Sequence, residues 1–304
     1  MEFWRIANNQ IISSQTVNWI GFDINKEYYT APNEYIDEGK FIIFRTAHGI
    51  GDWVMMERIA YNLKQKYPNC KVYVPTPKMC TDVFNFLYTR GWWKSWGDPS
   101  KTVEYMFKNN PYIDGWVDNW HTEVYHDHFR VYDSTDPTVT LTQQMCKFHH
   151  MEYNECTSLV PMLYFDDKEI SEGNTELTSL PKEFQFLHIS DRYTDRDTDI
   201  LLNYIEQIGL SNKKFVTYYK GDISETKFSK LNIVGNIEHI VDPRIQFYVK
   251  SKAENVVGVQ TGATDVISGL TKVHSLHHSP VLEETWSKGN YIPSISYINR
   301  KDFS

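Results

Sequence analysis

The hydrophobic pattern is strongest near residue 41, where the apolar stretch "KFIIF" precedes a turn with two glycines and a long segment with helical periodicity. The apolar side chains that recur at helical spacing are Trp53, Met56, Ala60, Leu63 and Tyr67. This pattern ends at Pro68, and a second apolar stretch, "CKVYVPTP", follows it along the chain. A strand, a helix and a second strand in this order predict a β-α-β unit and therefore a parallel sheet.

A second alternation of strands and helices begins near residue 184. The expected strands are "FQFLHIS", "KKFVTYYKG" and "AENVVGV", and the expected helices lie before Gly209, in "DPRIQFYVKSK" and after "QTG". We therefore expect two α/β domains, residues 1–165 and 180–304, joined by the polar segment "DDKEISEGNTELTSLPKE". Two such domains predict a cleft with ligands at the carboxyl ends of the strands.

Two parts of the first domain have weaker patterns. Residues 1–38 contain short alternating pieces that suit strands or an extended arm, whereas residues 90–165 are rich in Trp, His, Pro and Asp. In the latter we expect loops, short strands and a surface for an acceptor. Its tryptophans pack a core or stack on a sugar or a base; they are Trp92, Trp93, Trp96, Trp116 and Trp120.

Composition narrows the class of protein. The 304 residues carry a formal net charge of −8, which argues against a chain that coats a polyanion. No window approaches the 18 or so apolar residues of a membrane span, and the N-terminal segment has no apolar core of a signal peptide, so we expect a cytoplasmic protein. The four cysteines are too few for a disulfide scaffold, and reduced thiols are expected.

The first glycine turn, "HGIGDWV", matches neither the dinucleotide fingerprint nor a P-loop. Gly49 and Gly51 let the backbone approach a ligand closely, and His48 beside them either touches the substrate or packs. Asp52 lies where a helix begins, and the helix dipole favours its ionised form. It is either an N-cap or a base that accepts a proton from an acceptor hydroxyl.

The second glycine turn, "GVQTGATDVISGL", also lies between a strand and a helix. Thr261 and Thr264 offer hydroxyl donors there, and unpaired N–H groups at the start of a helix suit an anion. The turn therefore indicates either a phosphate site or an ordinary β-α connection.

No metal or other cofactor is expected. Asp195, Asp197, Asp199 and Glu206 have the spacing of a calcium loop, but Ile200 replaces the glycine that such a loop needs. Candidate zinc ligands lie in the middle of the chain, at spacings that match no standard pattern; they are His121, His126, His128, His149, His150, Cys146 and Cys156.

Taken together, the two halves resemble the heptosyltransferase-like glycosyltransferases of family nine. The resemblance lies in the "GIGD" turn with its strand and helix, in "KYPNCKVYV", in "NNPYIDGWV" and in "VVGVQTGATDVISGL", and it spans about residues 41–280. It implies the GT-B architecture of two facing Rossmann-like domains, with acceptor binding in the first and a nucleotide sugar in the second. It also implies that Asp52 is the general base.

The resemblance places donor contacts in the second domain. The family's turn reads Asp-Thr-Gly-x-x-His, and here it reads Gln260, Thr261, Gly262, Ala263, Thr264, Asp265. The first and last residues differ from the family pattern, so the identity of the donor sugar does not carry over, and a carboxylate in place of an imidazole would repel a diphosphate unless it binds sugar hydroxyls. Ser190, Arg192 and Lys220 follow strands where the family places polar or basic groups on the donor phosphates.

We therefore expect an inverting, metal-independent glycosyltransferase that uses a nucleotide-diphosphate sugar and a glycan acceptor, of unknown oligomeric state. One alternative is a phage-type enzyme that glycosylates hydroxymethylated pyrimidine bases in DNA. Its contacts with DNA would come from a basic face of Arg58, Lys64, Lys66 and Lys71. The other alternative is a non-catalytic module that binds a nucleotide or a glycan.

Overall fold

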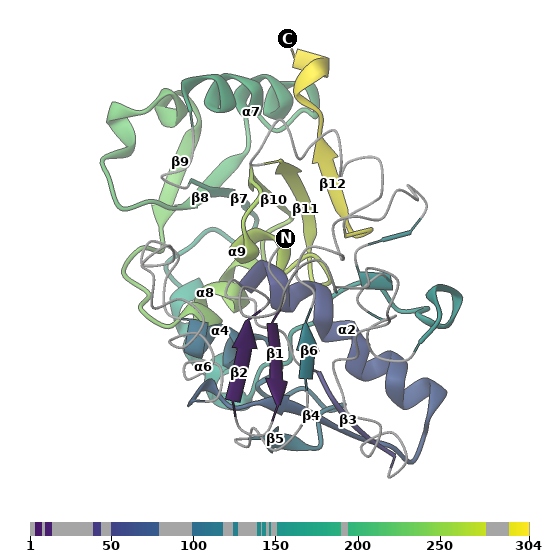
Figure 1. Ribbon diagram of the computed structural model, residues 1–304. Helices are drawn as coiled ribbons and strands as arrows, with labels where there is room; N and C mark the ends of the chain where they lie inside the picture. The colour runs from purple at the N-terminus through teal and green to yellow at the C-terminus, as the bar shows by residue number, and fades with distance from the viewer. Residues whose placement is uncertain are drawn as a thin grey trace. The chain divides into compact units, whose positions relative to one another are not determined.

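The computed structural model describes residues 4–7, 10–13, 39–43, 50–78, 99–117, 124–126, 139–140, 142–143, 146, 151–189, 194–277 and 292–303. The chain forms two compact units (Figure 1). The first is Met1–Leu159 with Gly289–Ile292, and the second is Val160–Lys288 with Pro293–Ser304.

The first unit contains the predicted β-α-β unit. Its parallel sheet has the order β3-β4-β5, with β3 at Lys40–Ile42, β4 at Lys71–Pro75 and β5 at Gly115–Val117. Helix α2, Ile50–Lys66, connects β3 to β4. It buries four of the five apolar positions that the periodicity picked out, Trp53, Met56, Ala60 and Leu63, whereas Tyr67 follows the helix and is partly exposed.

A helix also lies where the sequence indicated only loops and short strands. Helix α4, Pro99–Phe107, buries Val103, Met106 and Phe107. The rings of Trp53 and Phe107 meet edge to face with centroids 5.8 Å apart, so α4 packs against α2. The expectation of an irregular region is therefore wrong at this point, although the short strand β5 and the 3-10 turn η3, Tyr153–Glu155, fit it.

The N-terminal residues form strands, one of the two forms expected for residues 1–38. Strand β1, Trp4–Ala7, pairs antiparallel with β2, Gln10–Ser13, and with β6, Val124–His126. The sheet order is β2-β1-β6, so the N-terminal segment is joined to the middle of the chain by backbone hydrogen bonds.

The second unit is built on a six-stranded sheet in which every neighbouring pair is parallel. Its strands are β7 (Gln185–His188), β8 (Lys214–Tyr218), β9 (Asn232–Asn236), β10 (Asn255–Val259), β11 (Lys272–Leu276) and β12 (Ile295–Ile298). They lie in the order β12-β11-β10-β7-β8-β9. Counted from its first strand, this is the 3-2-1-4-5-6 order of a Rossmann fold.

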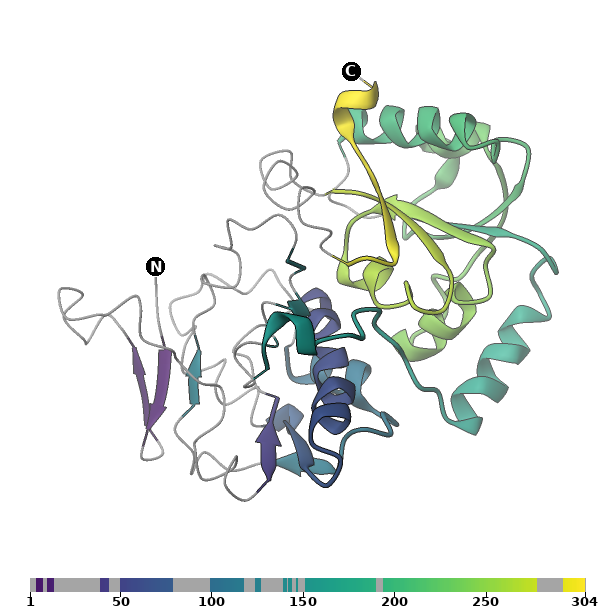
Figure 2. The same cartoon turned by 90° about the vertical axis from the view of Figure 1, so that its right-hand side faces the viewer.

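Helices lie on both faces of this sheet (Figures 1 and 2). Helix α7, Asp195–Gln207, packs Leu201 and Ile205 on an apolar cluster that includes Leu187 and Val257 of the sheet. On the other face, the last residue of helix α8, Pro243–Lys250, reaches the ring of Phe186. Among its described residues the unit also has three 3-10 turns: η4 (Ile223–Glu225), η5 (Lys227–Lys230) and η7 (Arg300–Phe303).

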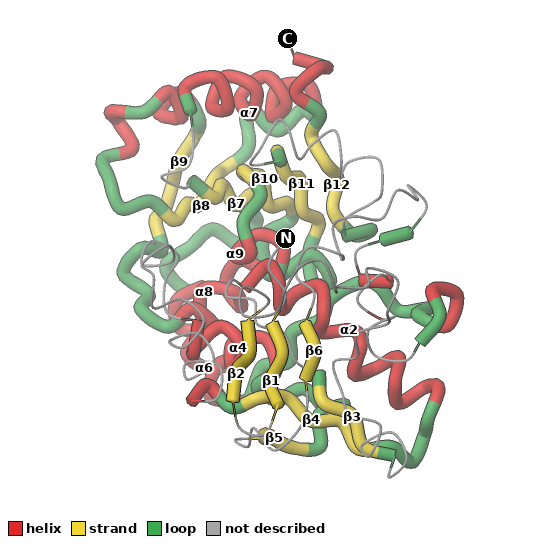
Figure 3. Tube along the Cα trace, viewed as in Figure 1, coloured by secondary structure: helices red, strands yellow, loops and turns green. Residues whose placement is uncertain are grey.

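The polar segment expected to be a linker is a helix. Helix α6, Asp167–Leu177, begins with a capping box between Asp166 and Glu169 and appears among the helices in Figure 3. The buried Glu169 carboxylate accepts from Arg244 of α8, with Nε and Oε1 2.7 Å apart. The prediction of a linker is therefore wrong. It failed because the residues that α6 buries against α8 are a glutamate and a glycine, Gly173, so the helix shows no apolar periodicity in the sequence.

Among the helices of the described residues, none is long and apolar enough to cross a membrane.

Candidate functional site

The strand order of the second unit creates one distinctive position. From β7 the chain builds outward through β8 and β9, and it then returns to the other side of β7 for β10. The connections on the two sides of this point run in opposite directions, so the carboxyl ends of β7 and β10 border a crevice in which such sheets bind ligands. His188 ends β7, and Gln260 and Thr261 follow β10 directly.

The turn after β10 is held by its own side chains. Helix α9 is only Gly262–Asp265, a single turn, and Thr261 precedes it in an extended conformation. The Thr261 backbone N–H donates to Thr264 Oγ1 at 3.0 Å, and the Thr264 hydroxyl donates to the Thr261 carbonyl at 2.7 Å. Thr264, which makes these bonds, is buried, whereas Thr261, Gly262 and Ala263 are partly exposed. These last three are the residues of the predicted donor turn that a ligand can reach.

Asp265 points into the protein. Its exposed fraction is 2%, Gln260 Nε2 donates to its Oδ2 at 3.2 Å, and the Thr264 hydroxyl lies 3.3 Å from its Oδ1. Burial raises its pKa to about 7, with the bonds from Gln260 and Thr264 opposing the rise. The structure therefore does not support a carboxylate directed at the donor. The bond between Gln260 and Asp265 also joins the two positions that depart from the family pattern.

Two buried basic residues, His188 and Lys250, lie beside Tyr218, and His188 also contacts the turn. His188 Nε2 lies 3.3 Å from Thr261 Oγ1, and the imidazole stacks on the ring of Tyr218 at 6.4 Å. Lys250 Nζ lies 5.3 to 5.8 Å from the ring centroids of Phe186, Tyr218 and Phe247. Burial lowers the pKa of Lys250 to about 7. Burial, with a smaller effect from the Lys250 charge, holds the pKa of His188 well below its usual value.

Sequence reasoning missed His188 and Lys250. His188 is an isolated polar residue at the end of an apolar strand, and its contact with Thr261 depends on β7 and β10 being neighbours. Lys250 ends α8 and meets aromatic rings of β7, β8 and its own helix. The sequence did contain one signal for His188: a histidine at the end of the first strand of an α/β series lies at the edge of the sheet where ligands bind.

Three predicted donor residues follow other strands of the same edge. Lys220 lies two residues after β8, and its side chain is exposed. Ser190 and Arg192 come shortly after β7 and lie outside the described residues. Their contacts with donor phosphates stay predictions.

The predicted acceptor side lies in the first unit. Helix α2 begins at Ile50, which puts Gly51 and Asp52 in its first turn, where the helix dipole favours a negative charge. Asp52 is thus inside the helix rather than at its cap. The Asp52 side chain, His48 and Gly49 lie outside what the structure describes.

A buried polar cluster fixes α2 below that turn. Arg58 donates to the neighbouring Glu57 carboxylate through Nε at 2.6 Å and through its terminal nitrogen at 2.7 Å. Asn110 Nδ2 donates to the same carboxylate at 2.8 Å. Asn110 belongs to the "NNPYID" segment, so this segment is bonded to the helix that carries Asp52.

The cations of the basic face proposed for DNA contact are paired with three carboxylates of the protein. Arg58 pairs with Glu57, Lys66 pairs with Glu155 at 2.6 Å, and Lys64 and Lys71 both pair with Asp114. Each of the four cations thus has a carboxylate beside it, and a cation with an internal partner gains less from a phosphate. The pairing of these side chains therefore weakens the case for DNA contacts from this face.

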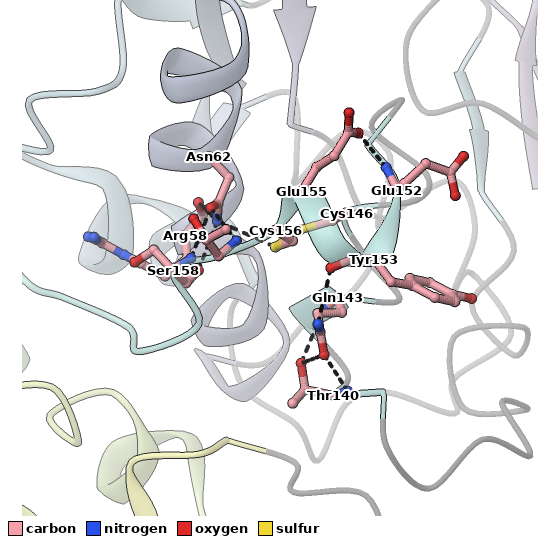
Figure 4. Close-up of a disulfide and its surroundings, with 11 residues drawn as sticks. Arg58, Asn62, Thr140, Gln143, Cys146, Glu152, Tyr153, Glu155, Cys156 and Ser158 are labelled. Carbon is pink, nitrogen blue, oxygen red and sulfur yellow. Dashed lines mark hydrogen bonds between the residues drawn. A yellow bond between two sulfur atoms is a disulfide. The ribbon is translucent and has the colours of Figure 1, made fainter.

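Two of the four cysteines are joined, contrary to the expectation of reduced thiols. Cys146 and Cys156 form a disulfide with Cα atoms 6.4 Å apart, which removes both as thiolate ligands for zinc (Figure 4). Asn62 of α2 holds the segment that follows: its Oδ1 accepts from the Thr157 and Ser158 N–H groups, each at 3.0 Å. Cys70 is a buried free thiol, and Cys80 lies outside the described residues.

Two of the four acidic residues of the calcium-like spacing, Asp197 and Asp199, have structural partners. Thr194 caps α7, Asp197 completes the capping box, and the Asp197 carboxylate accepts from Arg300 at 2.8 Å. Asp199 pairs with Lys227 at 2.6 Å. Within the described ranges, no group of three or more His, Cys, Asp or Glu residues is placed to hold a metal ion.

Comparisons with known proteins bear on the fold. No protein-family model matches the chain, and no curated protein matches it in sequence. The structure of a family 9 glycosyl transferase from Veillonella parvula has a TM-score of 0.56 at 8% identity, over 91% of this chain and 88% of that one. The structure of the ADP-heptose lipopolysaccharide heptosyltransferase II of E. coli is less similar, with a TM-score of 0.47 at 12% identity over 85% of this chain and 89% of that one.

The likeness to the Veillonella protein covers both units of the chain, which agrees with the parallel sheets described above. At 8% identity it is a likeness of fold rather than of sequence. The expectation drawn from the two glycine turns is confirmed at this level: the chain has the fold of a family 9 glycosyltransferase.

Proposed function

We propose that the protein is a glycosyltransferase that transfers a sugar from a nucleotide-diphosphate sugar to an acceptor hydroxyl. The observation that carries the proposal is the polar group at the switch point of the six-stranded sheet, where Thr261 and His188 meet at the ends of β7 and β10. The shared fold with a glycosyl transferase supports the same class of reaction.

In this proposal the second unit binds the donor. The Thr261 hydroxyl and the backbone of Gly262 and Ala263 contact the diphosphate, and Lys220, an exposed cation on the same edge of the sheet, pairs with it. Hydrogen-bond donors and a cation fixed beside the diphosphate stabilise the charge that develops when the glycosidic bond breaks. Because the protein supplies these groups, we propose that transfer needs no metal ion.

The first unit binds the acceptor, and Asp52 is the general base. The acceptor oxygen attacks the anomeric carbon from the face opposite the diphosphate, its proton passes to Asp52, and the bonding electrons of the breaking C–O bond leave with the diphosphate. The configuration at the anomeric carbon is therefore inverted. We propose a glycan as the acceptor.

The test compares the wild type with Asp52→Asn, which keeps the size of the side chain and removes its basicity. We expect transfer and donor hydrolysis, followed as nucleoside diphosphate release, to fall by about 10²- to 10⁴-fold, while donor affinity stays within about twofold. Glu104→Gln, an exposed carboxylate on α4 of the same unit, is the matched control and should retain full activity.

The result also separates an enzyme from a binding module. Donor binding without turnover in the wild type would favour a non-catalytic module. Full turnover by Asp52→Asn would contradict the assignment of the base. Lipopolysaccharide-type glycans and hydroxymethylated DNA are compared as acceptors in parallel, and transfer to DNA would overturn the glycan assignment.

A further inference from the structure

The contact between His188 and Thr261 joins the two strands that border the switch point. His188 is in register with Gly258 of β10, so β10 has no side chain at the paired position. The imidazole therefore lies against β10 and brings Nε2 to 3.3 Å from Thr261 Oγ1. With an exposed fraction of 6%, His188 does not itself form the surface that a ligand meets.

The imidazole is neutral at physiological pH. Its surroundings are a buried lysine, Lys250, and the aromatic ring of Tyr218, and both burial and the Lys250 charge disfavour the imidazolium form. A neutral imidazole has one N–H donor and one acceptor nitrogen. The bond to Thr261 therefore depends on which nitrogen carries the hydrogen.

The two tautomers have opposite consequences for Thr261. If Nε2 accepts, the Thr261 hydroxyl hydrogen points at His188 and cannot reach an anion. If Nε2 carries the hydrogen and donates, the Thr261 hydroxyl hydrogen is left to bond a phosphate oxygen. The Thr264 hydroxyl donates to the Thr261 carbonyl at 2.7 Å, and its oxygen, 3.5 Å from Thr261 Oγ1, is a second acceptor that the Thr261 hydroxyl hydrogen can reach when no anion is bound.

We propose that His188 is a positioning residue of the donor site, which donates from Nε2 to Thr261 Oγ1 and so directs the Thr261 hydroxyl at the diphosphate of a nucleotide sugar. The inference rests on the function proposed above. His188 acts through Thr261 and touches no reacting atom.

The test is a double-mutant cycle on donor affinity in the full chain. His188→Leu removes the bond but keeps an apolar side chain of similar bulk, and Thr261→Val removes the hydroxyl at constant shape. The dissociation constants of UDP, GDP, ADP and CDP are measured by calorimetry for the wild type, both single variants and the double variant. Each single variant should weaken the best binder about five- to tenfold, and the double variant should weaken it no further.

Two further variants separate positioning from packing. His188→Gln offers an amide N–H at similar reach, and it should restore most of the affinity that His188→Leu loses. His274→Leu is the matched control, because His274 is also a buried histidine of this sheet but bonds Tyr204 on the opposite face, with Nδ1 and Oη 2.7 Å apart. It should lower the melting temperature without changing the dissociation constant.

The tautomer provides a second readout. Imidazole ¹⁵N chemical shifts should report the Nε2–H form of His188 when the best of the four diphosphates is bound. The Nδ1–H form in that complex, additive losses in the double variant, or wild-type affinity in His188→Leu would each overturn the inference while leaving the proposed function in place. Failure of the wild type to bind any of the four diphosphates would overturn both.

Discussion

The carboxyl group of Asp265 lies in the proposed donor turn but points into the protein. Its two oxygens lie beside Gln260 and Thr264, inside the protein. Asp265, where the family pattern has a histidine, therefore buries a carboxyl group instead of repelling the donor. The burial should make the free energy of unfolding depend on pH.

The direction of that dependence follows from the pKa of about 7, which is above the usual value of 3.8. Between these values the folded state holds a proton that the unfolded state has lost, so stability falls as pH rises through this range, and the penalty is complete above pH 7. Asp265→Asn removes the titration. Its Nδ2 can donate to Gln260 Oε1, which has no partner among the described residues, once the Gln260 amide turns over.

We therefore predict that Asp265→Asn is more stable than the wild type by about 1 to 3 kcal/mol at pH 8, with a much smaller difference at pH 4.5. Urea unfolding at the two pH values measures this gap. Asp302→Asn, at an exposed carboxylate of η7, should show no gap that depends on pH. Equal gaps for Asp265→Asn at both pH values would contradict the buried titration.

At the scale of elements, α6 and α8 approach so closely that only glycine fits between them. A Cβ atom on Gly173 would lie 2.2 Å from the ring of Tyr248, and that ring is fixed by a 2.9 Å bond from its hydroxyl to Asn174. Helix propensity alone would favour alanine by about 1 kcal/mol. Here the clash outweighs propensity because the ring cannot move without losing its bond.

We predict that Gly173→Ala lowers the free energy of unfolding by about 1 to 3 kcal/mol. Ser171→Ala, two residues earlier on the exposed side of α6, is the matched control and should be neutral or slightly stabilising. Both are compared by denaturant unfolding. A stabilised Gly173→Ala variant would show that α6 and α8 are not packed as described.

The elements found from the sequence are those whose burial pattern is simple. Helix α2 buries seven apolar side chains, four of them at the spacing seen in the sequence, and α7 and the strands of the second unit are equally clear. Helix α6 was missed because its buried face holds Glu169 and Gly173. Helix α4 was missed because its nine residues give too few turns for a period to stand out.

The candidate site was partly predictable for a related reason. Thr261 and Gly262 follow from local turn chemistry, which a sequence displays directly. The contact of His188 with Thr261 depends on β7 lying beside β10, and these strands are separated by the whole of β8, β9 and their connecting helices. Contacts between distant segments leave no local pattern.

At the scale of the whole molecule, the charge distribution agrees with a small-molecule donor better than with a nucleic acid. The net charge is −8, and the four cations once considered for DNA contact are paired with carboxylates. The second unit has a complete Rossmann strand order with polar groups at its switch point. The central claim is therefore that this point binds a nucleoside diphosphate.

The measurement that tests this claim most directly is a thermal-shift series of the wild type, Thr261→Val and the exposed control Thr178→Val. Each is heated with UDP, GDP, ADP, CDP and their sugars in the presence of EDTA. We predict that one nucleotide class raises the melting temperature of the wild type and of Thr178→Val by several degrees, and that Thr261→Val shows a smaller shift at equal concentration. No shift of the wild type with any of these compounds, or an equal shift in Thr261→Val, would contradict the account.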